Sequence, residues 1–170
     1  MKGDSVDSRE RLRRSYRPAR VEWLFVGEAP PASGRFFYQR DSGLYRAFLE
    51  AFQVHFPRMA EGDFLDVFRS CGCYLIDLCP FPVDQLDANA RREACYASEV
   101  SLSRTIKKLE PARLATVVRS IRGNVKRAAF MAGWHVPVLD LPYPGRWSQH
   151  REKFVSRLAP ELKALKTSLY

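Results

Sequence analysis

The sequence predicts an α/β fold, a three-layer αβα sandwich around a central, mainly parallel sheet of four strands. Short apolar runs alternate along the chain with segments of helical periodicity, as they do in βαβ units. The chain has 170 residues, of which 46% are hydrophobic, enough for a single core of ordinary size. These observations favour one domain with helices on both faces of the sheet.

The first half of the chain contains two of the expected strands. Residues 1–20 are expected to form a basic, helical arm that ends at Pro18, ahead of a single domain at 21–170. The first strand is expected at 21–26 because this apolar run stops at Gly27. A loop rich in glycine and proline follows at 28–43, and then comes a helical face made by Leu44, Ala47, Phe48, Ala51 and Phe52. The second strand is expected at 74–79, closed by Pro80 and Pro82.

The second half repeats the alternation. One long helix is expected at 90–109, a third strand at 114–118 and a fourth at 135–141. Helices are expected after both strands, with apolar faces made by Val125, Ala128, Ala129 and Ala132, and by Phe154, Val155, Leu158, Leu162 and Leu165, the last bent at Pro160. Right-handed crossovers place the carboxyl ends of all strands along one edge, where open α/β sheets bind ligands.

Positive charge is concentrated in separate segments. The chain has 28 Lys and Arg against 19 Asp and Glu, a net charge of +9. Residues 1–20, 104–127 and 142–170 carry the excess, whereas 28–103 is acidic overall. Basic segments brought onto one face would suit a polyphosphate partner, and solvated helix surface is the alternative.

The cysteines and the termini exclude several classes of protein. Cys71, Cys73, Cys79 and Cys95 lack the paired spacing of zinc knuckles, so we expect buried free thiols and no metal site. No apolar stretch is long enough for a membrane span, and the first residues lack the apolar run of a signal peptide. We therefore expect a cytoplasmic monomer without membrane contact, associated with the nucleoid if its source is prokaryotic.

Three loops at the predicted edge carry more special residues than a plain connection needs. The first places Glu28 directly after a strand, between Gly27 and Ala29, with Phe36 and Phe37 downstream. The second contains Asp77, one acid in a buried strand, where an unpaired carboxylate is costly. The third is a rigid turn followed by an arginine and an aromatic, and its candidate DNA-contacting residues are Pro142, Tyr143, Arg146, Trp147 and His150.

Together the three loops resemble the uracil-DNA glycosylase superfamily, over about residues 20–165. Gly27-Glu28-Ala29-Pro30 is similar to its GEAPG-type first motif, and Leu141-Pro142-Tyr143-Pro144 to its HPSP motif with the DNA-penetrating loop after it. The resemblance implies that Phe36 or Phe37 stacks on a flipped base, that the backbone around Ala29 binds it, and that Asp77 stands where an asparagine reads it. Glu28 is the candidate catalytic carboxylate, which would stabilise an oxocarbenium-like sugar and orient water.

The sequence departs from that pattern at two positions. Leu141 stands in place of the family histidine, and His150 is nine residues further on. An ionised Asp77 accepts hydrogen bonds but donates none, which suits the amino group of cytosine or adenine better than uracil, unless Asp77 is protonated. The iron–sulfur branch has a cysteine ahead of its first motif, and here none precedes Cys71.

The sequence therefore predicts a DNA base-excision glycosylase that needs neither metal nor organic cofactor and hydrolyses the N-glycosidic bond of a flipped base, uracil or another deaminated or modified one, in single- or double-stranded DNA. The alternative is a non-catalytic nucleic-acid-binding member of the same superfamily. A site for a small nucleotide is a third reading, disfavoured because neither G-x-G-x-x-G nor a Walker loop is present.

Overall fold

Four parallel strands form one sheet in the order β2-β1-β3-β4. The computed structural model describes residues 2–135, 137–145 and 147–167, with the backbone alone for 2–7. The strands are β1 (Trp23–Gly27), β2 (Cys73–Asp77), β3 (Arg113–Thr116) and β4 (Leu139–Asp140). The predicted parallel sheet is confirmed.

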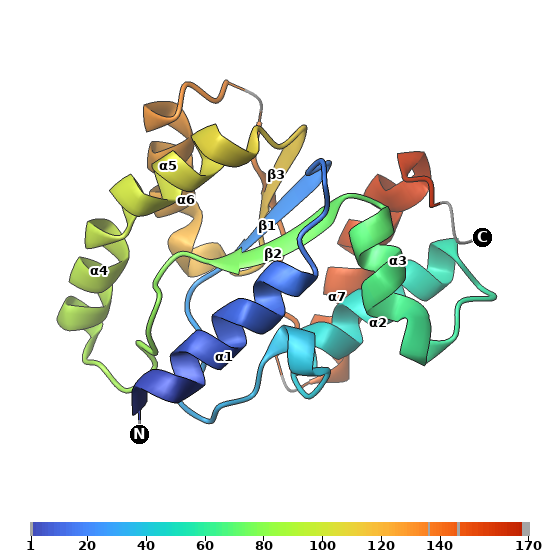
Figure 1. Ribbon diagram of the computed structural model, residues 1–170, viewed down its shortest axis with the longest axis horizontal. Helices are drawn as coiled ribbons and strands as arrows, with labels where there is room; N and C mark the ends of the chain where they lie inside the picture. The colour runs from blue at the N-terminus through green and yellow to red at the C-terminus, as the bar shows by residue number, and fades with distance from the viewer. Residues whose placement is uncertain (1, 136, 146, 168–170) are drawn as a thin grey trace.

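Helices cover both faces of the sheet (Figure 1). One layer holds α2 (Gly43–His55), α3 (Phe64–Ser70) and α7 (Ser148–Leu158), and the other holds α4 (Ala88–Ala97), α5 (Glu99–Leu109) and α6 (Arg122–Met131). Short 3₁₀ helices lie at η1 (Phe37–Gln39), η2 (Glu61–Asp63), η3 (Arg119–Ile121) and η4 (Ala159–Ala164). The predicted three-layer αβα sandwich is thus confirmed.

Aromatic side chains fill the layer between the sheet and helices α2, α3 and α7. The Phe25 ring of β1 meets Phe48 edge to face at 4.8 Å and lies 6.1 Å from Phe68. Phe68 in turn packs on Phe52 and Phe64. All five rings are fully buried, and such edge-to-face pairs add to the stabilisation from area burial. This cluster fixes α2, whose amino end leads into the predicted site.

Two predicted elements differ from the structure. The helix expected at 90–109 is divided into α4 and α5 at Ser98. The Ser98 hydroxyl donates to the Ala94 carbonyl at 2.8 Å, a side-chain bond that competes with the helical ladder and bends helices. Of the strand expected at 135–141, Leu139 and Asp140 form β4, the Leu141 N–H donates to the Thr116 carbonyl of β3 at 2.9 Å, and Pro137 ahead of them has no N–H to donate. Helix α3 was not predicted.

The basic arm expected at 1–20 is packed on the domain. Residues Lys2–Ser15 form α1, which lies in front of β2 in Figure 1. Tyr16, just beyond the helix, stacks on Tyr38 with ring centroids 5.5 Å apart, and Arg69 of α3 donates to the Ser15 carbonyl at 3.2 Å. The end of α1 is therefore fixed against Tyr38 and the end of α3.

Within the described ranges, every helix is too short or too polar to cross a bilayer.

We expect Phe68→Ala to lower the free energy of unfolding by about 3–5 kcal/mol, the usual cost of a large cavity left by a buried aromatic ring. Phe130→Ala is the matched control, because Phe130 is 76% exposed at the end of α6. Urea unfolding followed by circular dichroism measures both variants, and equal losses would show that the aromatic cluster is not the main support of the fold.

Candidate functional site

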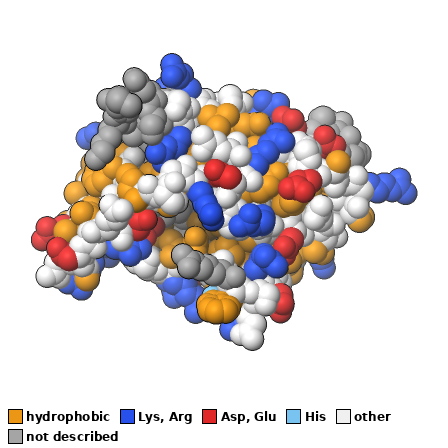
Figure 2. All heavy atoms as spheres, turned by 90° about the horizontal axis from the view of Figure 1, so that it is seen from below, with side chains coloured by type: hydrophobic (Ala, Val, Ile, Leu, Met, Phe, Trp, Pro, Cys, Tyr) orange, Lys and Arg blue, Asp and Glu red, His pale blue; other side chains and the backbone are white. Residues whose placement is uncertain are grey.

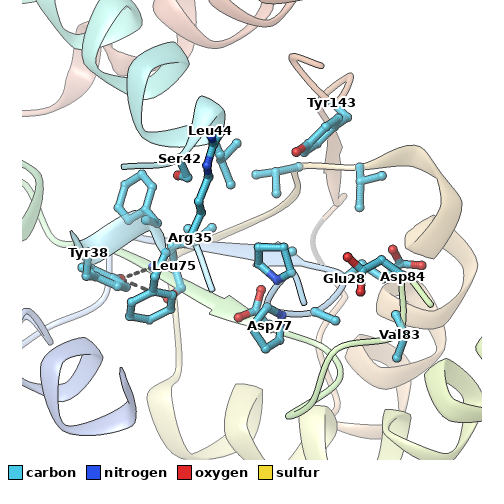
Figure 3. Close-up of a pocket in the computed structure, with 18 of the residues that line it drawn as sticks. Glu28, Arg35, Tyr38, Ser42, Leu44, Leu75, Asp77, Val83, Asp84 and Tyr143 are labelled. Carbon is cyan, nitrogen blue, oxygen red and sulfur yellow. Dashed lines mark hydrogen bonds between the residues drawn. The ribbon is translucent and has the colours of Figure 1, made fainter. Parts of the chain in front are cut away.

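A cavity of about 320 Å³ lies at the carboxyl edge of the sheet. Its lining comes from the loop after β1, the end of β2, and Tyr143 of the loop after β4 (Figure 3). The sheet therefore brings together Glu28, Ala29, Phe36, Phe37, Asp77 and Tyr143, all predicted as site residues. Arg13 of α1 and Arg91 of α4 also line the cavity, and neither was predicted.

Glu28 is held at the cavity wall by backbone pairing and by Arg91. After the strands end, the Leu78 N–H donates to the Gly27 carbonyl and the Cys79 N–H to the Glu28 carbonyl, each at 2.8 Å. The Arg91 guanidinium donates Nε–H to Oε1 of Glu28 at 2.8 Å and also binds Oε2, a bidentate pair. The Glu28 side chain is 14% exposed, so its charge is neutralised by one well-placed partner in a largely dry place.

Asp77 ends β2 and pairs with Arg13. The Arg13 Nη2 donates to Asp77 Oδ2 at 2.6 Å, and both side chains are 16% exposed. Asp77 Oδ1 would lie 2.9 Å from a Cβ atom on Gly27, its register partner in β1. A glycine is needed at 27 because a larger residue would push against this carboxylate.

Burial dominates the protonation of Asp77. Loss of water raises the pKa of Asp77 above its ordinary value, Arg13 and more weakly Arg9 oppose the rise, and Glu10 adds to it. Arg13 is thus the main group that favours the ionised form of Asp77.

The three aromatic residues after Glu28 have different roles. Phe37 meets Tyr38 and Phe48 edge to face at 5.0 and 5.4 Å, so it belongs mainly to the core. Phe36 carries the Arg13 guanidinium 5.3 Å from its ring centroid. The Tyr38 hydroxyl accepts from the Leu75 N–H at 2.8 Å and donates to the Leu75 carbonyl at 3.0 Å (Figure 3). Burial raises the pKa of Tyr38 well above its usual value, so this hydroxyl keeps its proton.

Side-chain bonds stiffen the loop between β1 and α2. Asp41 accepts from the Phe36 N–H at 2.7 Å, and Asp84, from the segment after β2, accepts from the Ala32 N–H at 3.1 Å. Ser42 caps α2 by accepting from the Tyr45 N–H. These bonds hold the cavity wall in one conformation.

The third loop contributes less to the cavity than predicted. Tyr143 is 54% exposed and lies across from Asp77 in Figure 3. Pro142, Trp147 and His150 are not among the lining residues: Trp147 is exposed, and the His150 ring packs against Gly145. Arg146 lies outside the described residues. Leu141 is completely buried, so it is a core residue.

A second hollow, of about 510 Å³, adjoins the cavity and shares Pro31, Arg35 and Tyr143 with it. Arg46 and Arg151 line it as well, and Arg151 pairs with Glu50 at 3.0 Å. We call this hollow the arginine groove. Figure 2, which views the molecule from below Figure 1, shows Lys and Arg side chains gathered on this face with acidic ones between them.

The four cysteines are buried free thiols. Cys79 Sγ lies 3.8 Å from Cys95 Sγ, which is 3.9 Å from Glu28 Oε1. Burial raises the pKa of Cys95 to about 12 and that of Cys71 to about 11, values that disfavour the nucleophilic thiolate. In the described part of the chain, no three His, Cys, Asp or Glu side chains group so that they could hold a metal ion.

Neither a scan against protein-family models nor a search of curated proteins found a match to this chain.

The residues that the sequence analysis missed are the partners of the two carboxylates. Arg13 and Arg91 lie on helices far along the chain, 64 and 63 residues from Asp77 and Glu28. An arginine in a charged helix has the pattern of a surface residue, so no local signal distinguished these two. The requirement that a buried carboxylate be paired predicted that partners exist but not which ones.

We expect Arg13→Met to raise the pKa of Asp77 further, because the main opposing charge is removed while burial remains. Since the pKa in the folded state already exceeds the ordinary value, ionising Asp77 costs the folded state free energy. Its contribution to stability therefore falls as the pH rises from near 4 through the raised pKa, and the fall extends to higher pH in the variant.

Carboxyl carbon shifts measured by NMR across a pH series test this expectation. Arg14→Met is the control, because Arg14 is 72% exposed and pairs with Glu10 instead. An unchanged Asp77 titration in Arg13→Met would show that the pair does not exist in solution.

Proposed function

We propose that this protein is a DNA glycosylase of the uracil-DNA glycosylase superfamily, which hydrolyses the N-glycosidic bond of a flipped, deaminated or otherwise modified base. The observation that carries the proposal is the placement of Glu28 and Asp77 in one cavity, beside the Phe36 ring and next to the arginine groove. The three motifs that resemble the superfamily support it, because the sheet brings residues of all three to the same edge.

The cavity suits a single planar ring. Its volume is at the lower end of the range for small-molecule sites, and most of its surface is apolar. Flipping a base out of the stack costs a few kcal/mol, which a pocket of this kind offsets by stacking and hydrogen bonds.

Glu28 would act on the sugar. As the bond to the base breaks, positive charge develops on the ring oxygen and C1′, and a fixed carboxylate stabilises that charge. Water adds to C1′, one of its protons passes to the carboxylate or to solvent, and the electron pair of the broken bond leaves with the base. Arg91 binds both carboxylate oxygens of Glu28 and orients them, which is a positioning role.

The arginine groove would hold the DNA backbone. Arg35 lines both the cavity and the groove, and Arg46 lies in the first turn of α2. Phosphates favour both guanidinium groups and helix amino ends. The exposed Trp147 ring follows the same loop as Tyr143, where a wedge between bases would stand.

The non-catalytic alternative has specific support as well. Leu141, in place of the histidine expected from the resemblance, is completely buried, and both Glu28 oxygens are bound by Arg91. A pure binding protein would keep the groove and the cavity and would tolerate the loss of Glu28.

We expect release of free base from duplexes or single strands containing uracil, hypoxanthine, xanthine or an alkylated base. Glu28→Gln should slow release by about 10²- to 10⁴-fold, the usual range for loss of a catalytic carboxylate. Glu61→Gln, exposed in η2, is the control. Base release is quantified by chromatography. If none of these DNAs releases a base while DNA binding is intact, the non-catalytic alternative is established.

We expect Arg46→Ala to weaken DNA binding alike for all sequences and to reduce the slope of log K against log salt by about 1, one phosphate contact. Arg58→Ala is the matched control, because Arg58 is exposed beyond the far end of α2, about 20 Å away by helix length. Fluorescence anisotropy across a salt series measures both, and an unchanged slope in Arg46→Ala would remove the groove from the interface.

A further inference from the structure

Arg13 reaches the cavity from α1, a helix outside the region that resembles the glycosylase superfamily. Its guanidinium lies over the Phe36 ring and bonds Asp77, two residues predicted to contact a flipped base. Glu10 fixes the same guanidinium by accepting from Nη1 at 2.8 Å. Tyr16 and Arg69 hold the end of α1 in place. The arginine is therefore a positioned part of the cavity wall.

Arg13 and Asp77 have complementary hydrogen-bonding capacity. An ionised carboxylate accepts and cannot donate, whereas a guanidinium donates through five N–H groups and cannot accept. At 2.6 Å the two groups stand side by side and offer an acceptor next to a donor. A primary amide such as asparagine offers the same pair of functions in one side chain.

Both groups retain capacity for a ligand. Among the described residues, Arg13 donates one hydrogen bond from Nη1 and one from Nη2, and each of these NH₂ groups carries a second N–H. Asp77 uses Oδ2 for Arg13, and a carboxylate has about four acceptor positions.

We propose that Arg13 is a specificity-determining residue, which supplies the donor that Asp77 lacks so that the two side chains together recognise a planar ring with a carbonyl oxygen beside a ring N–H. The proposal rests on the function proposed above. The ring N–H donates to Asp77, and the carbonyl oxygen accepts from Arg13.

Asp77 alone is expected to favour the amino group of cytosine or adenine, and the donors of Arg13 reverse that preference. An exocyclic amino group would bring a donor against the donors of Arg13, so cytosine and adenine are disfavoured. Methylation of the ring N–H removes the bond to Asp77 and places a methyl group against a buried carboxylate. Uracil, hypoxanthine and xanthine satisfy both groups, and 3-methyluracil does not.

The test compares wild type, Arg13→Met, and the double variant Arg13→Met with Asp77→Asn. Methionine keeps much of the length and packing of arginine but has no donor, and the asparagine restores a donor and an acceptor in one side chain. Arg14→Met is the control for the change of charge on α1. Two readouts are used: base release from uracil-containing DNA, and binding of free uracil and 3-methyluracil followed by NMR. Circular dichroism verifies that each variant is folded.

We expect Arg13→Met to reduce uracil release and uracil binding by about 10- to 100-fold, as loss of a charge-assisted hydrogen bond does. The double variant should recover to within a few-fold of wild type, 3-methyluracil should bind weakly throughout, and Arg14→Met should be unchanged. Unchanged uracil binding in Arg13→Met, or loss that Asp77→Asn does not restore, would overturn the proposal.

The two proposals fail in different ways. If wild type binds uracil in an Arg13-dependent manner but releases no base from DNA, the proposed glycosylase activity is wrong and the proposed recognition by Arg13 and Asp77 stands. If wild type releases uracil and Arg13→Met does so equally well, the proposed glycosylase activity stands and the proposed role of Arg13 is wrong. If wild type binds none of uracil, hypoxanthine and xanthine, and releases no base from any of the DNAs used above, both proposals are wrong.

Discussion

The site depends on the parallel pairing of β1 with β2. Their register sets Gly27 beside Asp77 in the last pair, and the contact leaves no room for a Cβ atom. Two further backbone bonds, from Leu78 and Cys79, continue the pairing beyond the strands and hold the carbonyls of Gly27 and Glu28. Two acids separated by 49 positions in the sequence therefore occupy the same cavity without any direct bond between them.

Two like charges in one small cavity require separate counter-ions, and the helices provide them. Arg91 of α4 comes from one helical layer, and Arg13 of α1 comes from beside the edge strand. The arrangement couples the site to the packing of both helices, because movement of either would leave a buried carboxylate without its partner. The aromatic cluster under α2 and the capped loop before it fix the opposite wall.

Much of the fold could be predicted from local pattern, and part of the site could not. Alternating apolar runs and helical faces were sufficient for the three layers, and acids that interrupt or follow buried strands identified Glu28 and Asp77. The break between α4 and α5 at Ser98 was not predicted, because it depends on one hydroxyl donating to a carbonyl one turn earlier in the helix. Phe36 and Phe37 have the same local pattern and are equally buried, yet Phe37 packs on Phe48 while the Phe36 ring carries the Arg13 guanidinium, a difference set by tertiary packing alone.

Tyr38 also covers part of the open edge of the sheet, along β2. Since β2 lies at the edge of the sheet, the N–H and carbonyl of Leu75 are open to another strand unless something occupies them. The Tyr38 hydroxyl occupies both groups, because it accepts a hydrogen bond from the Leu75 N–H and donates one to the Leu75 carbonyl. A strand from another molecule could pair with β2 at this point only after displacing the buried Tyr38 ring. The Tyr38 hydroxyl therefore protects this part of the edge from intermolecular β-pairing and from the aggregation that such pairing begins.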